Sequence, residues 1–380
     1  MTSSSIVAAR LKAGRWWYDS VSSLVAVSLE SMRIAQIAPL YESCPPKLYG
    51  GTERVVSYLT EDLVAAGHDV TLFASGDSET SARLIAPCSH AIRLQPEGAD
   101  GIAYHTLMMQ QVAKRSHEFD VLHFHTDYFH FPTFEWCAEK TLTTLHGRLD
   151  APSMTDILRA FSAMPLVSIS DAQRLPVPWA NWKKTIHHGL PADTYALGSG
   201  TEGYLAFVGR ISPEKGPDRA IAIAKGAGVP IKLAAKIDPA DRVYFEREIA
   251  SLFDDPLVDY IGEIGEHQKS GFFGNALGLV FPIAWPEPFG LVMIEAMATG
   301  TPTIAFRHGS VAEIIEDGIT GFIVDTIDEA IAAVPKLAAL DRGAIRKRFE
   351  DRFAIRRVSD AYVALYKRLA RSRAGIAIPA

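Results

Sequence analysis

The chain has 380 residues, a length that favours two domains over a single hydrophobic core. Hydrophobic residues make up 48% and charged residues 22%, which excludes a disordered, coiled-coil or collagen-like chain. The 38 basic and 44 acidic residues give a net charge of −6, so the charge does not favour nucleic acid as a partner. Three cysteines without a C-x-x-C pair exclude a disulfide framework or a zinc ribbon, and agree with thiols in a reducing cytosol.

The first 31 residues precede the first predicted strand and make a poor signal peptide. Asp19 interrupts a mild apolar stretch, and no small-residue cleavage site follows it. We expect residues 1–31 to be a leader that is disordered or does not belong to the native protein, with an interfacial membrane helix as the alternative. No run of 18 apolar residues occurs, so we expect no transmembrane helix and a cytoplasmic location.

Short apolar segments alternate with helical patterns from residue 33 onward. Arg33–Ala38 is typical of a buried strand, Thr52–Ala66 places apolar residues on one helical face, and Val70–Ala74 follows as the next strand. Further strands are predicted at Asp120–His125, Thr141–His146, Leu166–Ser170 and Thr185–His188. Because these runs lack polar alternation, they predict a parallel sheet covered by helices on both faces.

The pattern repeats after a linker. Small and polar residues between Ala192 and Gly203 indicate the linker itself. Strands are then predicted at Tyr204–Val208, Ile231–Ala235, Val258–Ile261, Leu279–Ile283, Thr303–Phe306 and Phe322–Val324. We therefore predict an α/β protein of two doubly wound, Rossmann-like parallel-sheet domains, at residues 32–190 and 191–354, facing a central cleft.

The last predicted helix is strongly basic. Residues 342–373 carry eleven Lys or Arg against three Asp or Glu, and their apolar residues recur at helical spacing. The pattern predicts an amphipathic helix, whose part at about 355–373 packs back on the N-terminal domain. Its basic face is either solvated or attracted to an anionic membrane surface, which would give peripheral membrane association, or to an acidic acceptor.

The most informative stretch is FPIAWPEPFGLVMIEAMATGTP, residues 281–302. It predicts a strand, a Pro-rich loop, and a helix that begins near Gly290 and stops at Gly300. The free N–H groups at the start of that helix form an anion site, and Gly290 allows a ligand to approach the backbone. Glu287 and Glu295 flank the site and suit sugar and ribose hydroxyls, with a helix cap and a solvated helix position as their structural alternatives.

A second motif, FVGRISPEKG at residues 207–216, follows the first strand of the second half. Arg210 and Lys215 suit the neutralisation of a diphosphate, and unpaired surface cations are the alternative. In the first half, Gly50-Gly51 precedes a helix and either matches this loop-to-helix element or is only a tight turn. The absence of G-x-G-x-x-G and of G-x-x-x-x-G-K-[ST] argues against a nicotinamide dehydrogenase and a P-loop ATPase.

Together these motifs resemble the retaining glycosyltransferases of family 4, which have the GT-B fold. The family's Glu-x7-Glu motif matches Glu287 and Glu295, and its Gly-Arg…Lys-Gly element matches residues 209–216. The resemblance extends from about Met32 to Tyr366. It includes YGGTERVV as the N-terminal Gly-rich loop, Ile186–Leu190 as the linker motif and Phe353–Leu369 as the closing helix.

The resemblance implies a nucleotide-diphosphate sugar donor in the inter-domain cleft, with a UDP-sugar mildly favoured, and no cofactor. The implied donor-binding residues are Gly51, Gly209, Arg210, Lys215, Glu287, Phe289, Gly290, Leu291, Val292 and Glu295. Arg210 and Lys215 would hold the diphosphate, and Glu295 the ribose. Glu287 and the backbone of residues 289–292 would hold the transferred sugar, and His146, at a strand end, would lie beside it. The implied catalytic set is His146, Glu287, Arg210 and Lys215.

Histidines gather in the N-terminal half. His123 and His125 lie two apart on a predicted strand and therefore share one face. We expect them to line the acceptor side of the cleft, with a polar lining of no catalytic effect as the alternative. With His146 they could suggest a metal site, but no carboxylate motif accompanies them and no Asp-x-Asp occurs, so we expect no metal.

The sequence thus predicts a metal-independent glycosyltransferase that moves a hexose from a nucleotide-diphosphate sugar to an acceptor hydroxyl. Retention of anomeric configuration is implied by the resemblance alone. A nucleotide-sugar epimerase on the same fold and a catalytically silent sugar-nucleotide-binding subunit are the alternatives. The acceptor stays open among a polysaccharide, a lipid and a small metabolite.

Overall fold

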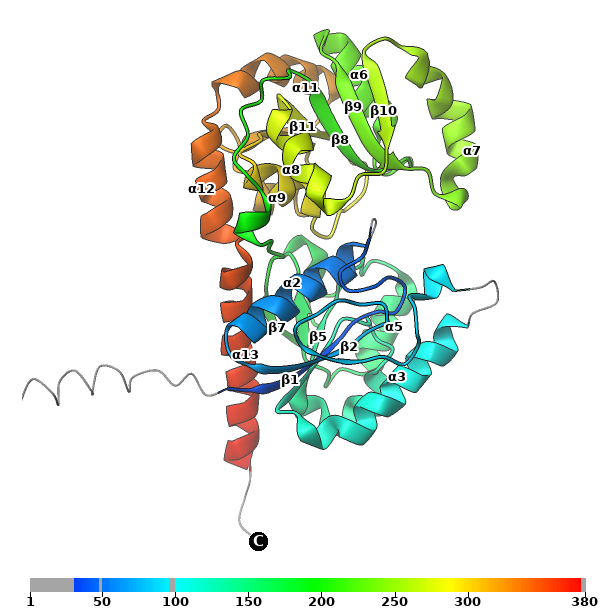
Figure 1. Cartoon of the computed structure of the whole chain (residues 1–380), viewed down its shortest axis with the longest axis vertical. Helices are drawn as coiled ribbons and strands as arrows, with labels where there is room; N and C mark the ends of the chain where they lie inside the picture. The colour runs from blue at the N-terminus through cyan, green and yellow to red at the C-terminus, as the bar shows by residue number, and fades with distance from the viewer. Residues whose placement is uncertain (1–30, 48–49, 96–99, 377–380) are drawn as a thin grey trace, which may run out of the picture.

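A computed structural model describes residues 31–47, 50–95 and 100–376 and contains two α/β domains, one above the other in Figure 1. Each domain is built on a parallel sheet, so the predicted fold class is confirmed. The predicted leader, residues 1–31, lies outside the described residues except for Ser31. No helix in the described part of the chain is long and apolar enough to cross a membrane.

The N-terminal sheet has seven strands among the described residues, in the order β3-β2-β1-β4-β5-β6-β7. They are β1 (Arg33–Ile37), β2 (Asp69–Phe73), β3 (Arg83–Ile85), β4 (Val121–Phe124), β5 (Thr141–Thr144), β6 (Leu166–Ser168) and β7 (Trp182–Thr185). The register pairs Ile34 with Val70 on one side and with Val121 on the other. The strand order reverses at β1 and β4, and the loops at the carboxyl ends of strands at such a switch point form a crevice.

The C-terminal sheet has six strands in the described range, in the order β10-β9-β8-β11-β12-β13. They are β8 (Leu205–Arg210), β9 (Ile231–Lys236), β10 (Val258–Gly262), β11 (Gly278–Phe281), β12 (Thr303–Phe306) and β13 (Gly321–Val324). Here the order reverses between β8 and β11. The two motifs singled out in the sequence follow these two strands, which explains why they meet at one edge of the sheet.

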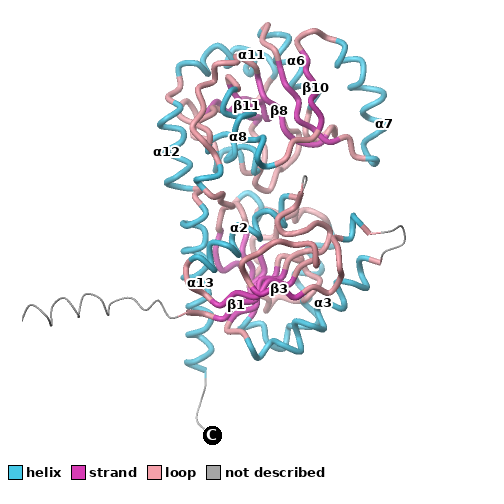
Figure 2. The backbone as a smooth tube through the Cα atoms, in the orientation of Figure 1, coloured by secondary structure: helices cyan, strands magenta, loops and turns pink. Residues whose placement is uncertain are grey.

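Helices cover both sheets (Figure 2). In the first domain they are α2 (Gly51–Ala65), α3 (Gly101–Arg115), α4 (Phe131–Phe134) and α5 (Pro152–Ala160). In the second they are α6 (Pro217–Ala227), α7 (Arg242–Tyr244), α8 (Glu266–Asn275), α9 (Leu291–Ala298), α10 (Val311–Ile314), α11 (Ile327–Ala333) and α12 (Arg342–Arg352). The last helix, α13 (Ile355–Ile376), returns to the first domain (Figure 1).

The basic C-terminal segment forms two helices, α12 and α13, where the sequence predicts one. The break lies where the chain crosses between the domains. Leu190 N–H donates to Phe353 O, and Ile355 N–H donates to Leu190 O, both at 2.9 Å. Phe353 O and Ile355 N–H therefore pair with the linker instead of continuing the helix. Gly189 is required here, because a Cβ would lie 2.8 Å from Phe353 O.

The apolar face of α13 is buried within the protein. Val358, Tyr362 and Leu365 are buried against a cluster from β1, β2, β4 and α2 that includes Ile34 and Leu63. The helix thereby closes the hydrophobic core of the N-terminal domain. Any attraction of this segment to a membrane has to rest on its charges, because its apolar face is not available.

Two further strands differ from the prediction. β3 was not predicted, because Arg83–Ile85 is a short, partly exposed edge strand with no apolar run. β7 covers Trp182–Thr185 and ends where the predicted strand begins. The prediction relied on runs of apolar residues, and this edge strand carries polar residues. His187 and His188 lie in the loop beyond it.

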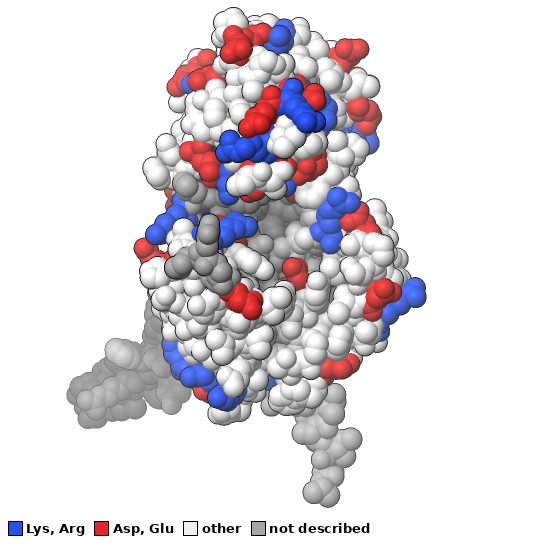
Figure 3. Space-filling view, turned by 90° about the vertical axis from the view of Figure 1, so that its right-hand side faces the viewer, with Lys and Arg blue, Asp and Glu red and all other residues white. Residues whose placement is uncertain are grey.

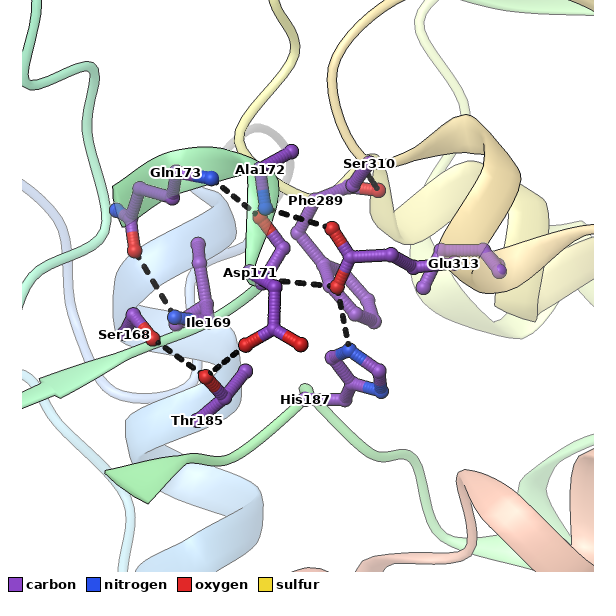
Figure 4. A network of polar contacts seen from close by, with 12 residues as sticks. Ser168, Ile169, Asp171, Ala172, Gln173, Thr185, His187, Phe289, Ser310 and Glu313 are labelled. Atoms are coloured by element: carbon purple, nitrogen blue, oxygen red, sulfur yellow. Dashed lines mark hydrogen bonds and ion pairs between the residues drawn. The ribbon is translucent and has the colours of Figure 1, made fainter. Parts of the chain in front are cut away.

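The domains are held together near this loop by one carboxylate (Figure 4). Glu313, on α10, accepts hydrogen bonds from the backbone N–H groups of Asp171 and Ala172, both at 2.7 Å, and from His187 Nε2 at 3.2 Å. Burial alone would raise the pKa of Glu313, but these hydrogen bonds lower it. A carboxylate of one domain therefore anchors the start of a 3₁₀ turn in the other.

We expect Leu365→Ala to lower the free energy of unfolding by about 2–5 kcal/mol, because it leaves a cavity between α13 and the sheet. Leu365 is 2% exposed. Urea unfolding measures the loss. The matched control is Ala364→Ser on the exposed face of the same helix. A loss at position 365 no larger than the control's would show that α13 is not docked in solution.

Candidate functional site

A cleft of about 530 Å³ lies between the two domains, a size typical of sites for small ligands. Figure 3 shows this hollow, with basic residues on both of its lips. The sequence-predicted residues that line it are Gly51, His125, His146, Gly209, Arg210, Lys215, Glu287, Phe289, Gly290, Leu291, Val292 and Glu295. Segments up to 244 residues apart in sequence thus converge on one cavity.

Two helix N-termini, those of α2 and α9, reach the cleft from opposite domains. A methyl group added at Gly51 would lie only 3.6 Å from Leu291 Cδ1, so the two helix starts are nearly in contact. Gly290 begins α9 with a φ of 80°, and a Cβ there would lie 2.8 Å from Met293 Cε, which explains the glycine. Both helices direct free backbone N–H groups and the positive ends of their dipoles at one place.

Lys215 lies in a three-part contact at the C-domain wall. Its Nζ is 2.5 Å from Glu287 Oε2 and 4.8 Å from the centre of the Trp285 ring. Trp285 Nε1 donates to the same carboxylate oxygen at 2.8 Å. The Lys215 ammonium group and the Glu287 carboxylate are thus held side by side in the cleft. The first is a cation and the second can bind hydroxyl groups.

Arg210 ends β8 and is oriented by carboxylates from two other segments. Its guanidinium lies 2.6 Å from Glu214 Oε1 and 3.4 Å from Asp241 Oδ2, and its side chain is 30% exposed. These partners come from the loop before α6 and the turn after β9. They restrict the rotamers of Arg210 while leaving part of its donor fork accessible from the cleft.

Glu295 is almost fully buried, at 1% exposure. Lys269, on α8, donates to its Oε1 at 2.6 Å, whereas its Oε2 has no hydrogen-bond partner among the described residues. A buried acceptor without a partner costs free energy that a ligand hydroxyl can recover. The alternative of a solvated helix position is wrong for Glu295, because the side chain is inside the protein.

An ion-pair series links this carboxylate to the other domain. Arg54, on α2, lies 2.5 Å from Glu266 on α8, and Glu266 lies 3.5 Å from Lys269, the partner of Glu295. Tyr195 also donates to Glu266. This series could not be predicted from the sequence, because no local motif indicates that α2 and α8 meet across the cleft. It couples the relative position of the domains to the wall of the site.

The three predicted histidines do not share one environment. His146 lines the cleft, and its Nε2 lies 2.9 Å from His125 Nδ1. His123 does not line the cleft; it is fully buried, between Tyr366 OH at 2.7 Å and Thr144 Oγ1 at 2.8 Å. The expectation that His123 lines the acceptor side is therefore wrong. His123 and His125 lie two residues apart and share one face of the sheet, but α13 covers the position of His123.

No group of three His, Cys, Asp or Glu side chains suited to a metal ion occurs in the described ranges. The three cysteines are buried. The N-domain wall of the cleft instead carries aromatic and acidic residues that the sequence analysis missed: Tyr41, Glu53, His105, Asp127 and Phe129. Tyr41, Asp127 and Phe129 lie in loops and His105 lies within α3, all without a recognisable motif. Glu53 lies in the segment YGGTERVV, in which only Gly51 was predicted as a site residue. His105 lies between Tyr41 and Phe129, with 5.3 Å between ring centres on each side.

Glu53, in the first turn of α2, is a buried carboxyl group on this wall. Burial raises its pKa to about 7, against a smaller opposing effect of backbone hydrogen bonds. The folded protein therefore keeps Glu53 protonated at pH values where the unfolded chain has already ionised it. This contribution to stability is fully present below about pH 4.5 and is lost as the pH rises to about 7.

Replacing Glu53 by Gln should consequently flatten the pH dependence of stability between pH 5 and 7. We expect the stability of the wild type relative to Glu53→Gln to fall by up to about 3 kcal/mol across this range, since one pKa unit corresponds to about 1.4 kcal/mol. Urea unfolding at a series of pH values measures both proteins. Parallel curves would contradict the raised pKa. The control is Glu246→Gln, an exposed carboxyl on the surface of the second domain.

Comparison with known proteins gives two family matches. Residues 49–188 match the family model described as Glycosyltransferase Family 4, and residues 196–352 match the one described as Glycosyl transferases group 1. An alignment of length 201 is 33% identical between this chain and D-inositol 3-phosphate glycosyltransferase of Mycobacterium tuberculosis (strain ATCC 25618 / H37Rv). The match covers 47% of this chain and 38% of that relative, so the chain matches less than two fifths of the length of these curated relatives.

Solved structures of similar fold cover most of the chain. Sucrose-phosphate synthase from Thermosynechococcus elongatus has a TM-score of 0.73 at 19% identity, over 90% of this chain and 100% of that one. Anabaena HepE in complex with UDP-glucose has a TM-score of 0.65 at 17% identity, over 91% and 100%. Two glycosyltransferase family models therefore match the two domains of the chain in succession, and the domains are arranged in the GT-B fold of the solved structures.

Proposed function

We propose that this glycosyltransferase moves a hexose from a nucleotide-diphosphate sugar to an acceptor hydroxyl, with retention of anomeric configuration and without a divalent metal. The observation that carries the proposal is the convergence on one cleft of two helix N-termini, the cations Arg210 and Lys215, and a carboxylate oxygen of Glu295 that has no partner among the described residues. A nucleotide-diphosphate sugar has complementary parts: an anionic diphosphate, a ribose and a hydroxyl-rich ring.

The proposed placement follows from charge. The diphosphate lies against Arg210, Lys215 and the N–H groups at the start of α9, where positive charge is concentrated. The ribose hydroxyls donate to Glu295, whose Oε2 is without a partner in the described part of the chain. The transferred sugar then lies near Glu287 and the α9 backbone, with His146 on the opposite lip.

The chemistry requires stabilisation of a leaving group. The bond between the anomeric carbon and the diphosphate oxygen breaks, a bond to the acceptor oxygen forms, and the acceptor hydroxyl loses its proton. Negative charge grows on the departing diphosphate, and Arg210, Lys215 and the helix start are preorganised to meet it. These groups perform the charge neutralisation for which other transferases use a metal ion.

The donor and the acceptor are supported to different degrees. The structure of HepE, a neighbour in fold, was solved with UDP-glucose, and we take a UDP-sugar as the donor of this chain by analogy. The acceptor faces the wall of Tyr41, Glu53, His105, Asp127 and Phe129. Aromatic faces and carboxyl groups suit a ring-bearing acceptor with hydroxyl groups, whether a saccharide, a lipid headgroup or a small metabolite.

Lys215→Met should weaken the binding of UDP by about 10- to 100-fold, because a charge-assisted hydrogen bond contributes about 1.5–3 kcal/mol. Glu295→Gln should weaken it by a similar factor through the ribose. Calorimetric titration with UDP measures both. Lys225→Met is the control, since Lys225 pairs with Asp255 and does not line the cleft. Wild-type affinity in both site variants would remove them from the donor site.

The product and the metal requirement are tested together. The assay supplies UDP-glucose with a panel of hydroxyl acceptors, and we expect EDTA not to change the rate of transfer. We expect the product to keep the α-anomeric configuration, which the anomeric coupling constant in proton NMR measures. Loss of activity with EDTA that Mg²⁺ or Mn²⁺ restores would contradict metal independence. A β-product would contradict retention, and an epimerised nucleotide sugar would favour the epimerase.

A further inference from the structure

Behind His146, a continuous series of buried polar side chains runs through the N-terminal sheet to α13. His146 Nε2 lies 2.9 Å from His125 Nδ1, and His125 Nε2 lies 2.9 Å from Gln36 Oε1. Gln36 Nε2 donates to Tyr366 OH at 3.2 Å. The series therefore connects a residue of the cleft to the last helix of the chain through His125, directly after β4, and Gln36 on β1.

The series continues on the other side of Tyr366. Tyr366 OH lies 2.7 Å from His123 Nδ1, and His123 Nε2 lies 2.8 Å from Thr144 Oγ1. Thr144 Oγ1 then lies 2.9 Å from Tyr362 OH. Gln36, His123, Thr144 and Tyr366 are fully buried. Burying polar groups costs free energy unless each group has a hydrogen-bond partner. The positions of these side chains are therefore closely constrained.

The geometry assigns the protons. Burial lowers the pKa of His123 and His125 well below the usual value and that of His146 to about 3, so each ring is neutral and carries one N–H. The Oε1 atom of Gln36 only accepts, so the proton of His125 is on Nε2. His125 Nδ1 is then an acceptor, and the proton of His146 must be on Nε2.

This assignment leaves His146 with one unused nitrogen. Its Nδ1 is buried, carries a lone pair, and has no partner within the described residues. The ring stacks on His188 with an interplanar angle of 13°, which fixes its plane. A buried acceptor without a donor is a cost that a ligand hydroxyl removes.

We propose that Gln36, His125 and Tyr366 are positioning residues that hold His146 as the Nε2–H tautomer, so that its Nδ1 accepts a hydrogen bond from a hydroxyl of the transferred sugar. The sugar contact rests on the proposed function, whereas the tautomer does not. In this arrangement His146 is a fixed acceptor and has no free N–H to donate to the sugar. The C-terminal helix lies far in sequence from His146, and it thereby takes part in preparing the site.

The direct test is the tautomer of His146 in the full chain labelled with ¹⁵N-histidine. Long-range ¹H–¹⁵N correlation spectra distinguish a protonated from an unprotonated ring nitrogen, and His146→Gln identifies the signal. We expect Nε2 protonated and Nδ1 unprotonated in the wild type without any ligand. A wild-type His146 that carries its proton on Nδ1 would overturn the proposal.

Two variants at Gln36 separate positioning from packing. Gln36→Glu still presents an oxygen to His125 and should keep the Nε2–H tautomer of His146, whereas Gln36→Leu removes the acceptor and should give a mixture of tautomers. Melting temperatures identify any variant that fails to fold. If the Leu and Glu variants both fold and have the same His146 tautomer, Gln36 does not set it.

The matched pair on α13 is Tyr366→Phe and Tyr362→Phe. Each removes one buried hydroxyl from the same helix, but only Tyr366 contacts Gln36. We expect Tyr366→Phe, and not Tyr362→Phe, to disturb the tautomer. In an assay that supplies UDP-glucose and no acceptor, UDP forms by cleavage of the donor. We expect Tyr366→Phe and Gln36→Leu to slow this formation of UDP about 10-fold, while the affinity for UDP stays within twofold. Equal effects of the two Tyr variants would overturn the role of Tyr366.

The outcomes for the donor site are distinguishable. UDP carries no sugar, so its failure to bind the wild type would refute the proposed UDP-sugar donor and leave the tautomer result intact. UDP binding with an unchanged rate of UDP release in Gln36→Leu would instead refute the sugar contact of His146.

Discussion

The approach of two helix N-termini, α2 from one domain and α9 from the other, is the constraint on which the rest of the site depends. Gly51 is the first residue of α2 and Gly290 is the N-cap of α9, and both glycines allow the helix starts to come close to each other and to a ligand. Unpaired N–H groups and aligned dipoles at one place favour an anion. Arg210 and Lys215 add formal charge, and their carboxylate partners hold them in position until an anionic ligand competes for them.

Two separate sets of contacts set the distance between these helix starts. Glu313 and the backbone pairing of Leu190 with residues 353–355 join the domains behind the cleft. Arg54 and Glu266 join them at its wall. The Arg54–Glu266 contact involves few groups and continues through Lys269 to Glu295. Binding of a ligand at Glu295 is therefore physically coupled to the relative position of the domains. The C-terminal helix crosses the same boundary and closes the N-terminal core.

The fold and the C-domain wall could be predicted from the sequence because local patterns determine them. Apolar runs mark parallel strands, and the motifs around Arg210 and Glu287 follow adjacent strands, so they meet wherever the sheet forms. The remaining features depend on contacts between distant segments. The break between α12 and α13 requires the linker at Leu190, the burial of His123 requires α13, and Lys269 becomes relevant only because α8 packs beside α9.

The central claim is that the cleft between the two helix N-termini binds a nucleotide diphosphate, and a crystal structure of the full chain grown with UDP tests it most directly. The account predicts the diphosphate within hydrogen-bond distance of Arg210, Lys215 and the first N–H groups of α9, with a ribose hydroxyl on Glu295 Oε2. A nucleotide bound elsewhere, or bound in the cleft with its ribose at the N-terminal lip and its phosphates away from α9, would contradict it.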